Sequence, residues 1–177
     1  MAAPSAASFI WGPYSHLCAW AALATFVADQ AHKAWMLMGF GIREAGRVYV
    51  TPFLDWVFVL NRGVSYGLFP DAGRWLLIVF AVAAVLFMWS WLARSGTGRL
   101  MATSLGLIIG GALANALDRV LYGGVVDYVS LHAFGFYWYV FNIADAAIVA
   151  GSGGLLYDSL IASRSRNDAA NAAQDGS

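Results

Sequence analysis

The amino-acid sequence predicts an all-α membrane protein with four transmembrane helices and a small β-rich outer platform between the first and second spans. Hydrophobic residues make up 60% of the 177 residues, charged residues make up 11%, and the mean hydropathy is +0.65. A soluble domain is typically about half apolar and roughly 25% charged. Four stretches are also long and apolar enough to cross a hydrocarbon core, which takes about 20 helical residues. These observations together predict a protein that lies in a lipid bilayer.

The four predicted spans are residues 14–38, 75–92, 100–117 and 137–161. Residues 1–13 contain no Lys or Arg, so the first span lacks the basic region of a cleavable signal peptide, and we expect it to be retained. The short link 93–99 carries two arginines, and two more follow the fourth span. Because basic residues are enriched in cytoplasmic connections, both termini are predicted to be cytoplasmic. Residues 1–161 are expected to form one domain, and the polar tail 162–177 to be disordered.

The first connection is predicted to form the platform. Residues 48–50 and 53–60 are rich in β-branched and aromatic side chains, and Pro52 and an Asn-Arg-Gly turn at 61–63 bound them. This composition is typical of short strands. Aromatic residues in such a platform would lie at the membrane interface.

Two aspartates in apolar or aromatic surroundings are the main indication of function. Asp127 follows two valines, and Asp145 lies inside the predicted fourth span. A carboxylate within a bilayer costs about 2.5 to 3.5 kcal/mol on insertion scales, so such residues usually mark functional sites. If both face one water molecule, repulsion and desolvation keep one of them protonated, and the pair can act as base and acid, as in an aspartic protease. The alternative is that each aspartate caps a helix or pairs locally, for example with Arg119.

The third span carries a polar face whose members follow helical spacing, namely Gly111, Asn115, Asp118 and Arg119. Lipid cannot satisfy polar groups, so this face must point into the protein. Asn142 shares a face with Asp145 on the fourth span. Asp29 and Lys33 have the spacing and order of a helical ion pair in the first span, for which a structural role is the favoured interpretation. Asp118 is expected to orient Arg119.

Other functional classes find less support in the sequence. The formal net charge is zero and the basic residues are dispersed, which argues against nucleic-acid binding. Cys18 has no partner for an internal disulfide, and His16, His32 and His132 lack the spacing of metal ligands, so no metal site is expected.

Two alternative activities stay open. Residues 63–67 match the G-x-S-x-G motif of serine hydrolases, with His132 downstream, but the strand-to-helix context of that motif is missing. A small proton-coupled transporter with Asp29, Asp127 and Asp145 as a relay is the other hypothesis. It is disfavoured because the polar residues of the third and fourth spans are confined to their outer halves.

Five segments follow one another in an order that is typical of one family. They are Asp29-Gln30-Ala31-His32-Lys33, Asn61-Arg62-Gly63-Val64-Ser65-Tyr66, Gly110-Gly111-Ala112-Leu113-Ala114-Asn115-Ala116-Leu117-Asp118-Arg119, Val125-Val126-Asp127-Tyr128 and Phe141-Asn142-Ile143-Ala144-Asp145. With these segments the chain resembles the bacterial lipoprotein signal peptidases, the type II signal peptidases of the aspartyl protease class. One segment alone would be weak evidence, whereas five in order over residues 29–145 are highly specific.

The resemblance implies a four-span aspartyl endopeptidase of the bacterial cytoplasmic (inner) membrane, with no cofactor and with its active site near the periplasmic face. Such enzymes cleave diacylglyceryl-modified prolipoproteins before the lipidated cysteine and bind globomycin-type inhibitors. The motifs imply that Asp127 and Asp145 form the catalytic dyad and that the platform clamps the lipidated peptide against membrane lipid. The resemblance further implies substrate-binding roles for Asn61, Gly63, Asn115, Arg119 and Asn142, and structural support from Asp29, Lys33 and Asp118.

Three departures from the family pattern flank the expected pocket. Ala114 stands where glycine is more usual, Ser65 and Tyr66 stand where alanine and phenylalanine are more usual, and Arg62 adds a charge beside Asn61. None of these departures removes a catalytic group. They are expected to tune the affinity for substrate or inhibitor.

Overall fold

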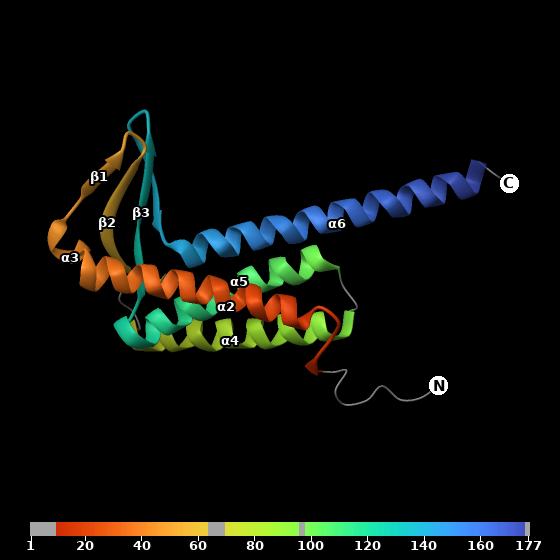
Figure 1. Ribbon diagram of the computed structural model, residues 1–177, viewed down its shortest axis with the longest axis horizontal. Helices are drawn as coiled ribbons and strands as arrows, with labels where there is room; N and C mark the ends of the chain where they lie inside the picture. The colour runs from red at the N-terminus through yellow and green to blue at the C-terminus, as the bar shows by residue number, and fades with distance from the viewer. Residues whose placement is uncertain (1–9, 64–69, 96–97, 176–177) are drawn as a thin grey trace.

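The computed structural model describes residues 10–63, 70–95 and 98–175. Within them, long helices form a bundle, and a four-stranded antiparallel sheet lies at one end of it and runs across the helices (Figure 1). The helical elements are α2 (Ser15–Ala34), the π-helical turn η1 (Trp35–Gly39), α3 (Ile42–Ala45), α4 (Pro70–Ser95), α5 (Arg99–Tyr122) and α6 (Ile143–Asp175). The strands are β1 (Val48–Thr51), β2 (Leu54–Asn61), β3 (Val125–Ala133) and β4 (Phe136–Phe141), in that order across the sheet.

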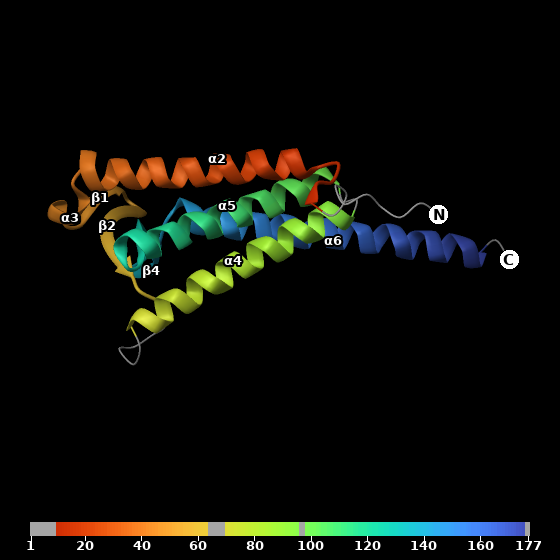
Figure 2. The same cartoon turned by 90° about the horizontal axis from the view of Figure 1, so that it is seen from below.

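Helix α5 packs against α2, α4 and α6, and Figure 2 shows it between α2 and α4. Glycines on α5 allow its close approach to α2 and α6. A Cβ at Gly106 would lie 2.6 Å from the carbonyl oxygen of Cys18 on α2, and one at Gly111 would lie 2.5 Å from the carbonyl oxygen of Ala144 on α6. Small residues are common where membrane helices touch, because they let the backbones approach. The contact at Gly111 sets the position of the first turn of α6.

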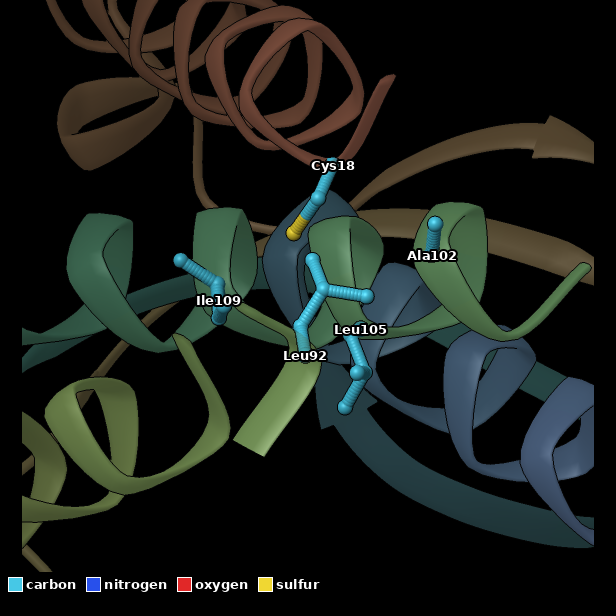
Figure 3. Packing of buried hydrophobic residues seen from close by; sticks show 5 residues of the cluster. All are labelled: Cys18, Leu92, Ala102, Leu105 and Ile109. Atoms are coloured by element: carbon cyan, nitrogen blue, oxygen red, sulfur yellow. The ribbon is translucent and has the colours of Figure 1, made fainter. Parts of the chain in front are cut away.

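Two apolar clusters hold the two ends of the bundle. The first joins the start of α2, the end of α4 and the first half of α5, and consists of Cys18, Leu92, Ala102, Leu105 and Ile109 (Figure 3). The second joins η1, α3 and β3 at the sheet end, and consists of Met36, Ile42, Val126 and Tyr128. The second cluster attaches the sheet firmly to the helices.

The sheet contains more of the chain than the sequence predicted. The strands expected at 48–50 and 53–60 are present as β1 and β2. The expectation that the platform lies wholly between the first and second spans is wrong, because β3 and β4 come from the connection between α5 and α6. These two strands pair around a turn in which Phe134 and Gly135 have φ angles of 51° and 81°. The apolar stretch expected to span from residue 137 therefore starts as strand β4, and the helix starts only at Ile143.

The outer surface of the bundle is strongly apolar. Among the described residues, the helical segments Gly73–Arg94 and Arg99–Tyr122 are long and apolar enough to cross a membrane. Helix α4 exposes large apolar side chains, including Phe80 at 71% and Phe87 at 68%. A continuous exposed surface of this kind is typical of contact with lipid.

Helix α6 extends further than expected. The sequence predicted a disordered tail from residue 162, whereas the structure has helix through Asp175. Alanine has the highest helix propensity, and the sequence between 169 and 173 is rich in it. The cytoplasmic position of this segment stays a prediction.

Candidate active site

Asp127 and Asp145 reach one site from two different elements. Asp127 lies on β3 opposite Val59 of β2, and its side chain is buried, whereas Asp145 lies in the first turn of α6 and is half-buried. Gly123 follows α5 with a φ of 75°. This left-handed conformation favours glycine and turns the chain out of the helix toward β3. Asp127 is thereby brought back over the start of α6.

Three asparagine side chains hold the two carboxylates. Asn61 Nδ2 donates to Asp127 Oδ2 at 3.1 Å, and Asn142 Nδ2 donates to Asp127 Oδ1 at 2.6 Å. Asn115 Nδ2 donates to Asp145 Oδ1 at 2.8 Å, while its Oδ1 accepts from Asn142 Nδ2 at 3.2 Å. A continuous chain of hydrogen bonds therefore joins the two carboxylates through Asn142 and Asn115.

Asn142 also begins helix α6 and orients Asp145. Its Oδ1 accepts from the backbone N–H of Asp145 at 2.9 Å, and its own backbone N–H donates to Asp145 Oδ2 at 3.3 Å. This reciprocal pattern is that of a capping box, in which two side chains satisfy the first N–H groups of a helix. The partial positive charge of a helix N-terminus also favours a carboxylate at this position. The alternative of local capping therefore holds for Asp145, and the same residue is also linked by hydrogen bonds to Asp127.

Burial raises the pKa of Asp127 to about 6, and the negative charge of Asp145 acts in the same direction. The amides of Asn61 and Asn142 and the charge of Lys33 oppose this rise by stabilising the ionised form. A carboxyl group with this pKa is partly protonated near neutral pH. Asp127 can therefore carry the proton of an acid–base pair, the arrangement that activates a water molecule.

A buried charge network supports the site from the helix side. Lys33 Nζ lies 2.7 Å from Asp29 Oδ2 and 2.7 Å from Asp118 Oδ2, and all three side chains are at most 1% exposed. Asp29 Oδ1 also accepts from the backbone N–H of Ala144 at 2.9 Å, and Asp118 Oδ2 from that of Val126 at 3.0 Å. The network therefore ties α2 and α5 to the first turn of α6 and to the start of β3, the two elements that carry the aspartates.

The helical ion pair expected between Asp29 and Lys33 is present. The expectation that Asp118 orients Arg119 is wrong, because Asp118 binds Lys33. Neighbouring residues on a helix point in different directions, so a contact between Asp118 and Arg119 is not favoured. Arg119 instead donates from Nη1 to the carbonyl oxygen of Asn115 at 3.1 Å.

Gln30 is a site-supporting residue that the sequence reasoning missed. Its Nε2 donates to Asp118 Oδ1 at 2.9 Å, to the carbonyl oxygen of Ala114 at 3.3 Å and to Asp29 Oδ2 at 3.3 Å. The sequence feature that could have indicated this role is the polar amide of Gln30 next to Asp29 inside an apolar predicted span. Ala114 itself is fully buried, so its extra methyl group relative to glycine is accommodated in the helix contact.

The turn after β2 is shaped by Asn61, whose Oδ1 accepts from the backbone N–H of Gly63 at 3.0 Å. This is an Asx turn, and Gly63 has a φ of 82°. Ser65 and Tyr66, and with them most of the G-x-S-x-G motif, lie outside the described residues. His132, the base that a serine hydrolase would need, binds Asp55 and not Asp118 or Asp127.

An apolar groove of about 1130 Å³ leads to Asp145. It lies between the β3–β4 hairpin, Phe53 and the first turns of α6, where Ala146, Val149 and Ala150 continue the lining beyond Asp145. Among the described residues, no three His, Cys, Asp or Glu side chains are placed to hold a metal ion. A helical membrane bundle that presents two linked carboxylates beside an apolar groove has the features of a membrane protease.

The comparisons with known proteins identify the family. Residues 21–161 match the family model of signal peptidase (SPase) II. The chain is 53% identical over 143 residues to the lipoprotein signal peptidase of Methylorubrum extorquens (strain PA1), covering 79% of this chain and 83% of that protein. It is 52% identical over 152 residues to the lipoprotein signal peptidase of Methylobacterium sp. (strain 4-46), covering 84% and 91%. The chain belongs to the signal peptidase II family.

Solved structures share the fold. A bacterial membrane enzyme solved by the in meso method at 1.9 Å resolution superposes with a TM-score of 0.72 at 23% identity, covering 82% of this chain and 93% of that one. A second bacterial membrane enzyme structure, at 2.3 Å resolution, gives a TM-score of 0.70 at 24% identity, covering 82% and 88%. The combination of helical bundle and end-on sheet is therefore shared with these enzymes.

Proposed function

We propose that this protein removes signal peptides from diacylglyceryl-modified prolipoproteins by hydrolysing the peptide bond before the lipidated cysteine, with Asp127 and Asp145 as its catalytic dyad. The observation that carries the proposal is the hydrogen-bonded chain from one carboxylate to the other through Asn142 and Asn115. Identities of about 50% to lipoprotein signal peptidases over most of the chain support the substrate class.

In the proposed reaction Asp145 is the base and Asp127 is the acid. Asp145 takes a proton from a water molecule, whose oxygen attacks the carbonyl carbon of the scissile peptide bond. Asp127, with a pKa of about 6, donates a hydrogen bond and then its proton to the carbonyl oxygen. When the tetrahedral intermediate collapses, the C–N bond breaks and the cysteine nitrogen leaves with a proton from Asp145. The proton of the new carboxyl oxygen returns to Asp127, which restores the starting state.

The surrounding polar groups would position the substrate backbone. We assign this role to Asn61, Gly63, Asn115, Arg119 and Asn142. The asparagines already orient the carboxylates, so their freedom to move is small and their amides are preorganised. Preorganised donors and acceptors stabilise developing charge without the cost of reorienting water.

We further propose that α2, α4, α5 and α6 all cross the bacterial cytoplasmic membrane, with both termini in the cytoplasm and the sheet at the periplasmic face. The charges of α2, at Asp29 and Lys33, are buried and paired, so they do not meet lipid. Helix α6 exposes Leu156 and Leu160 on its outer surface. The end of α4 and the start of α5 lie at the end of the bundle opposite the sheet (Figure 1), and these helix ends carry Arg94 and Arg99, as expected for the cytoplasmic side.

The apolar groove would receive the lipidated part of the substrate. Val149 lines the groove and is 71% exposed on the outer surface of α6, so the groove meets the surface that would face lipid. Exposed aromatic residues of the hairpin, such as Phe136 and Trp138, would lie at the membrane interface. Globomycin-type inhibitors are expected to compete with substrate at this groove.

The test is cleavage of a purified diacylglyceryl-modified prolipoprotein by the detergent-solubilised protein. Asp127→Asn and Asp145→Asn are each expected to abolish cleavage while the protein stays folded, and an unlipidated substrate is expected to stay intact. Asp158→Asn is the matched control, because it makes the same chemical change on α6, thirteen residues and about 20 Å beyond Asp145. Wild-type rates in either dyad variant would refute the assignment.

A proton-coupled transporter is the alternative use of the same acids. It predicts a proton flux in proteoliposomes that Asp145→Asn abolishes. The buried acids of the bundle lie close to the sheet, and α4 has no charged side chain between residues 75 and 92, so a relay across the whole membrane finds no support on that helix.

A further inference from the structure

The β3–β4 hairpin forms one wall of the apolar groove, and its outer part has little support from the rest of the sheet. Within the described sheet, the last backbone hydrogen bond between the hairpin and its neighbours runs from the N–H of His132 to the carbonyl oxygen of Phe53, at 2.9 Å. Beyond this point the two strands pair only with each other, and the hairpin extends away from the helices (Figure 1). Yet Ala133 and Phe136 of this outer part line the groove. A two-stranded ribbon alone is marginally stable in water, so the wall needs a further attachment.

The two faces of the hairpin have different neighbours. Side chains alternate along a strand, so Ala133 lies on the same face of β3 as Asp127. His132 lies on the opposite face, together with its β4 partner Tyr137. Asp55 of β2 shares that opposite face, because it pairs with the β3 residue two positions before His132. This second face points away from the dyad.

Four side chains on the second face, which we call the brace, join the hairpin to β2 and to the segment before β1. Asp55 is 0% exposed, and its Oδ2 accepts from Arg47 Nη1 at 2.7 Å. Its Oδ1 lies 3.0 Å from His132 Nε2, with which it forms a hydrogen bond. Tyr137 stacks on the His132 ring, with centroids 5.0 Å apart, and the Arg47 guanidinium lies 5.1 Å from the centre of the Tyr137 ring. The brace is therefore a closed ring of contacts that includes both strands of the hairpin.

The carboxylate at the centre of the brace makes these contacts specific. Burial acts to raise the pKa of Asp55, but the hydrogen bonds and charges of Arg47 and His132 outweigh this effect and hold that pKa below its usual range. A buried carboxylate is costly unless donors satisfy it. Asp55 therefore favours the one position of the hairpin in which both donors reach it.

We propose that the four side chains of the brace are positioning residues, which fix the groove wall and thereby set the affinity for the lipidated substrate. The inference rests on the proposed function. The dyad is held separately, because Asn61 and Asn142 bind Asp127 near the start of β3, five residues before His132. Loosening the brace lowers the fraction of molecules with a formed groove, which raises KM and leaves kcat unchanged.

Arg47 and Arg43 allow a matched comparison of this effect. Both are exposed and lie over an aromatic ring, at 5.1 Å from the centre of Tyr137 and 4.9 Å from that of Phe58. Phe58 belongs to β2 and not to the hairpin. With a synthetic diacylglyceryl lipopeptide, Arg47→Met is expected to raise KM about two- to fivefold at unchanged kcat, the effect of a partly exposed ion pair. Arg43→Met is expected to give the wild-type values of both.

Tyr137 gives a second comparison on the hairpin itself. Tyr137→Ala removes both ring contacts and is expected to raise KM about three- to tenfold. Tyr137→Phe keeps the ring and is expected to restore the wild-type KM. A defect of folding alone would lower the amount of active enzyme and leave KM unchanged.

A spin label measures the hold on the hairpin without any cleavage. Phe134→Cys places the label at the turn, where the side chain is fully exposed, and the native Cys18 is buried. Electron paramagnetic resonance is expected to show a more mobile label after Arg47→Met or Tyr137→Ala, and the wild-type mobility after Arg43→Met.

A lower kcat at constant KM in Arg47→Met would overturn the proposal, as would a label equally mobile in Arg47→Met and Arg43→Met. If the wild-type enzyme cleaves the lipopeptide and neither Arg47→Met nor Tyr137→Ala changes KM, this inference fails and the proposed function stands. If the wild type cleaves no lipidated substrate, the proposed function fails and this inference with it.

Discussion

Lys33 is the position at which one substitution tests the buried charge network most directly. Its Nζ lies 2.7 Å from a carboxylate oxygen of Asp29 and of Asp118, and 3.5 Å from Asn115 Oδ1. Lys33→Met keeps a long apolar side chain but leaves two buried carboxylates without their shared cation. Removing one partner of a buried ion pair costs about 3 to 5 kcal/mol. Because Lys33 balances two carboxylates, we expect the free energy of unfolding to fall by about 4 to 5 kcal/mol.

The assay is reversible unfolding of the protein in mixed micelles by SDS at neutral pH, followed by circular dichroism. The matched control is the triple variant Lys33→Met, Asp29→Asn and Asp118→Asn, in which these three positions carry no charge. Replacing every charge of a buried network by uncharged side chains often changes the stability little. The triple variant is therefore expected to regain most of the free energy of unfolding that Lys33→Met loses. A Lys33→Met variant whose free energy of unfolding lies within about 1 kcal/mol of wild type, the effect of an average substitution, would contradict this prediction. A triple variant less stable than Lys33→Met alone would contradict it as well.

Three further predictions concern catalysis and are checked by lipopeptide cleavage. Gly111→Ala is expected to lower kcat/KM about tenfold to a hundredfold, since its Cβ would lie 2.5 Å from the Ala144 carbonyl oxygen and displace the first turn of α6. The control is Gly153→Ala, whose Cβ would meet nothing within 4 Å and which should match wild type. Equal kcat/KM values for the two variants would contradict this prediction. Wild-type kcat/KM is expected to fall about tenfold per pH unit above about pH 6, because protonated Asp127 is lost there, and a flat alkaline limb would exclude Asp127 as the acid. Asn142→Ala removes an amide that lowers the pKa of Asp127, so the alkaline limb of the pH profile of kcat/KM is expected to move to higher pH. The value of kcat/KM itself is expected to fall about tenfold to a hundredfold. An alkaline limb at the wild-type pH would contradict the role of Asn142 in setting the pKa of Asp127.

The parts of the fold that the sequence predicted are those determined by local patterns. The predicted spans 75–92 and 100–117 lie inside α4 and α5, because an uninterrupted apolar run has few alternatives to a helix. Strands β1 and β2 were also predictable from β-branched and aromatic residues between turn signals. The aromatic run at 137–141 could not be assigned in this way, since an apolar stretch of that length suits a helix end and a strand equally well.

The site was predictable in its members but not in its contacts. Intramembrane acids and amides are costly, so Asp127, Asp145, Asn115 and Asn142 could be singled out by residue type and spacing. The role of Asn61 was implied only by the family resemblance. Asp118 was assigned to the wrong partner, because helical spacing gives the direction of a side chain on its own helix but not the residue that faces it. The partner, Lys33, lies 85 residues earlier in the chain, on α2.

The sequence by itself determined the membrane class and the family resemblance, and it singled out Asp127 and Asp145 as the candidate acids, since hydropathy and motif spacing are properties of the chain alone. Only the tertiary structure decided that Asn142 and Asn115 connect those acids, that Lys33 is shared by two aspartates, and that His132 binds Asp55 beside the groove. Each of these contacts joins residues on different helices or strands. Close helix packing at the glycines and the pairing of β2 with β3 bring these distant segments together. A local sequence pattern does not predict which distant segments come into contact.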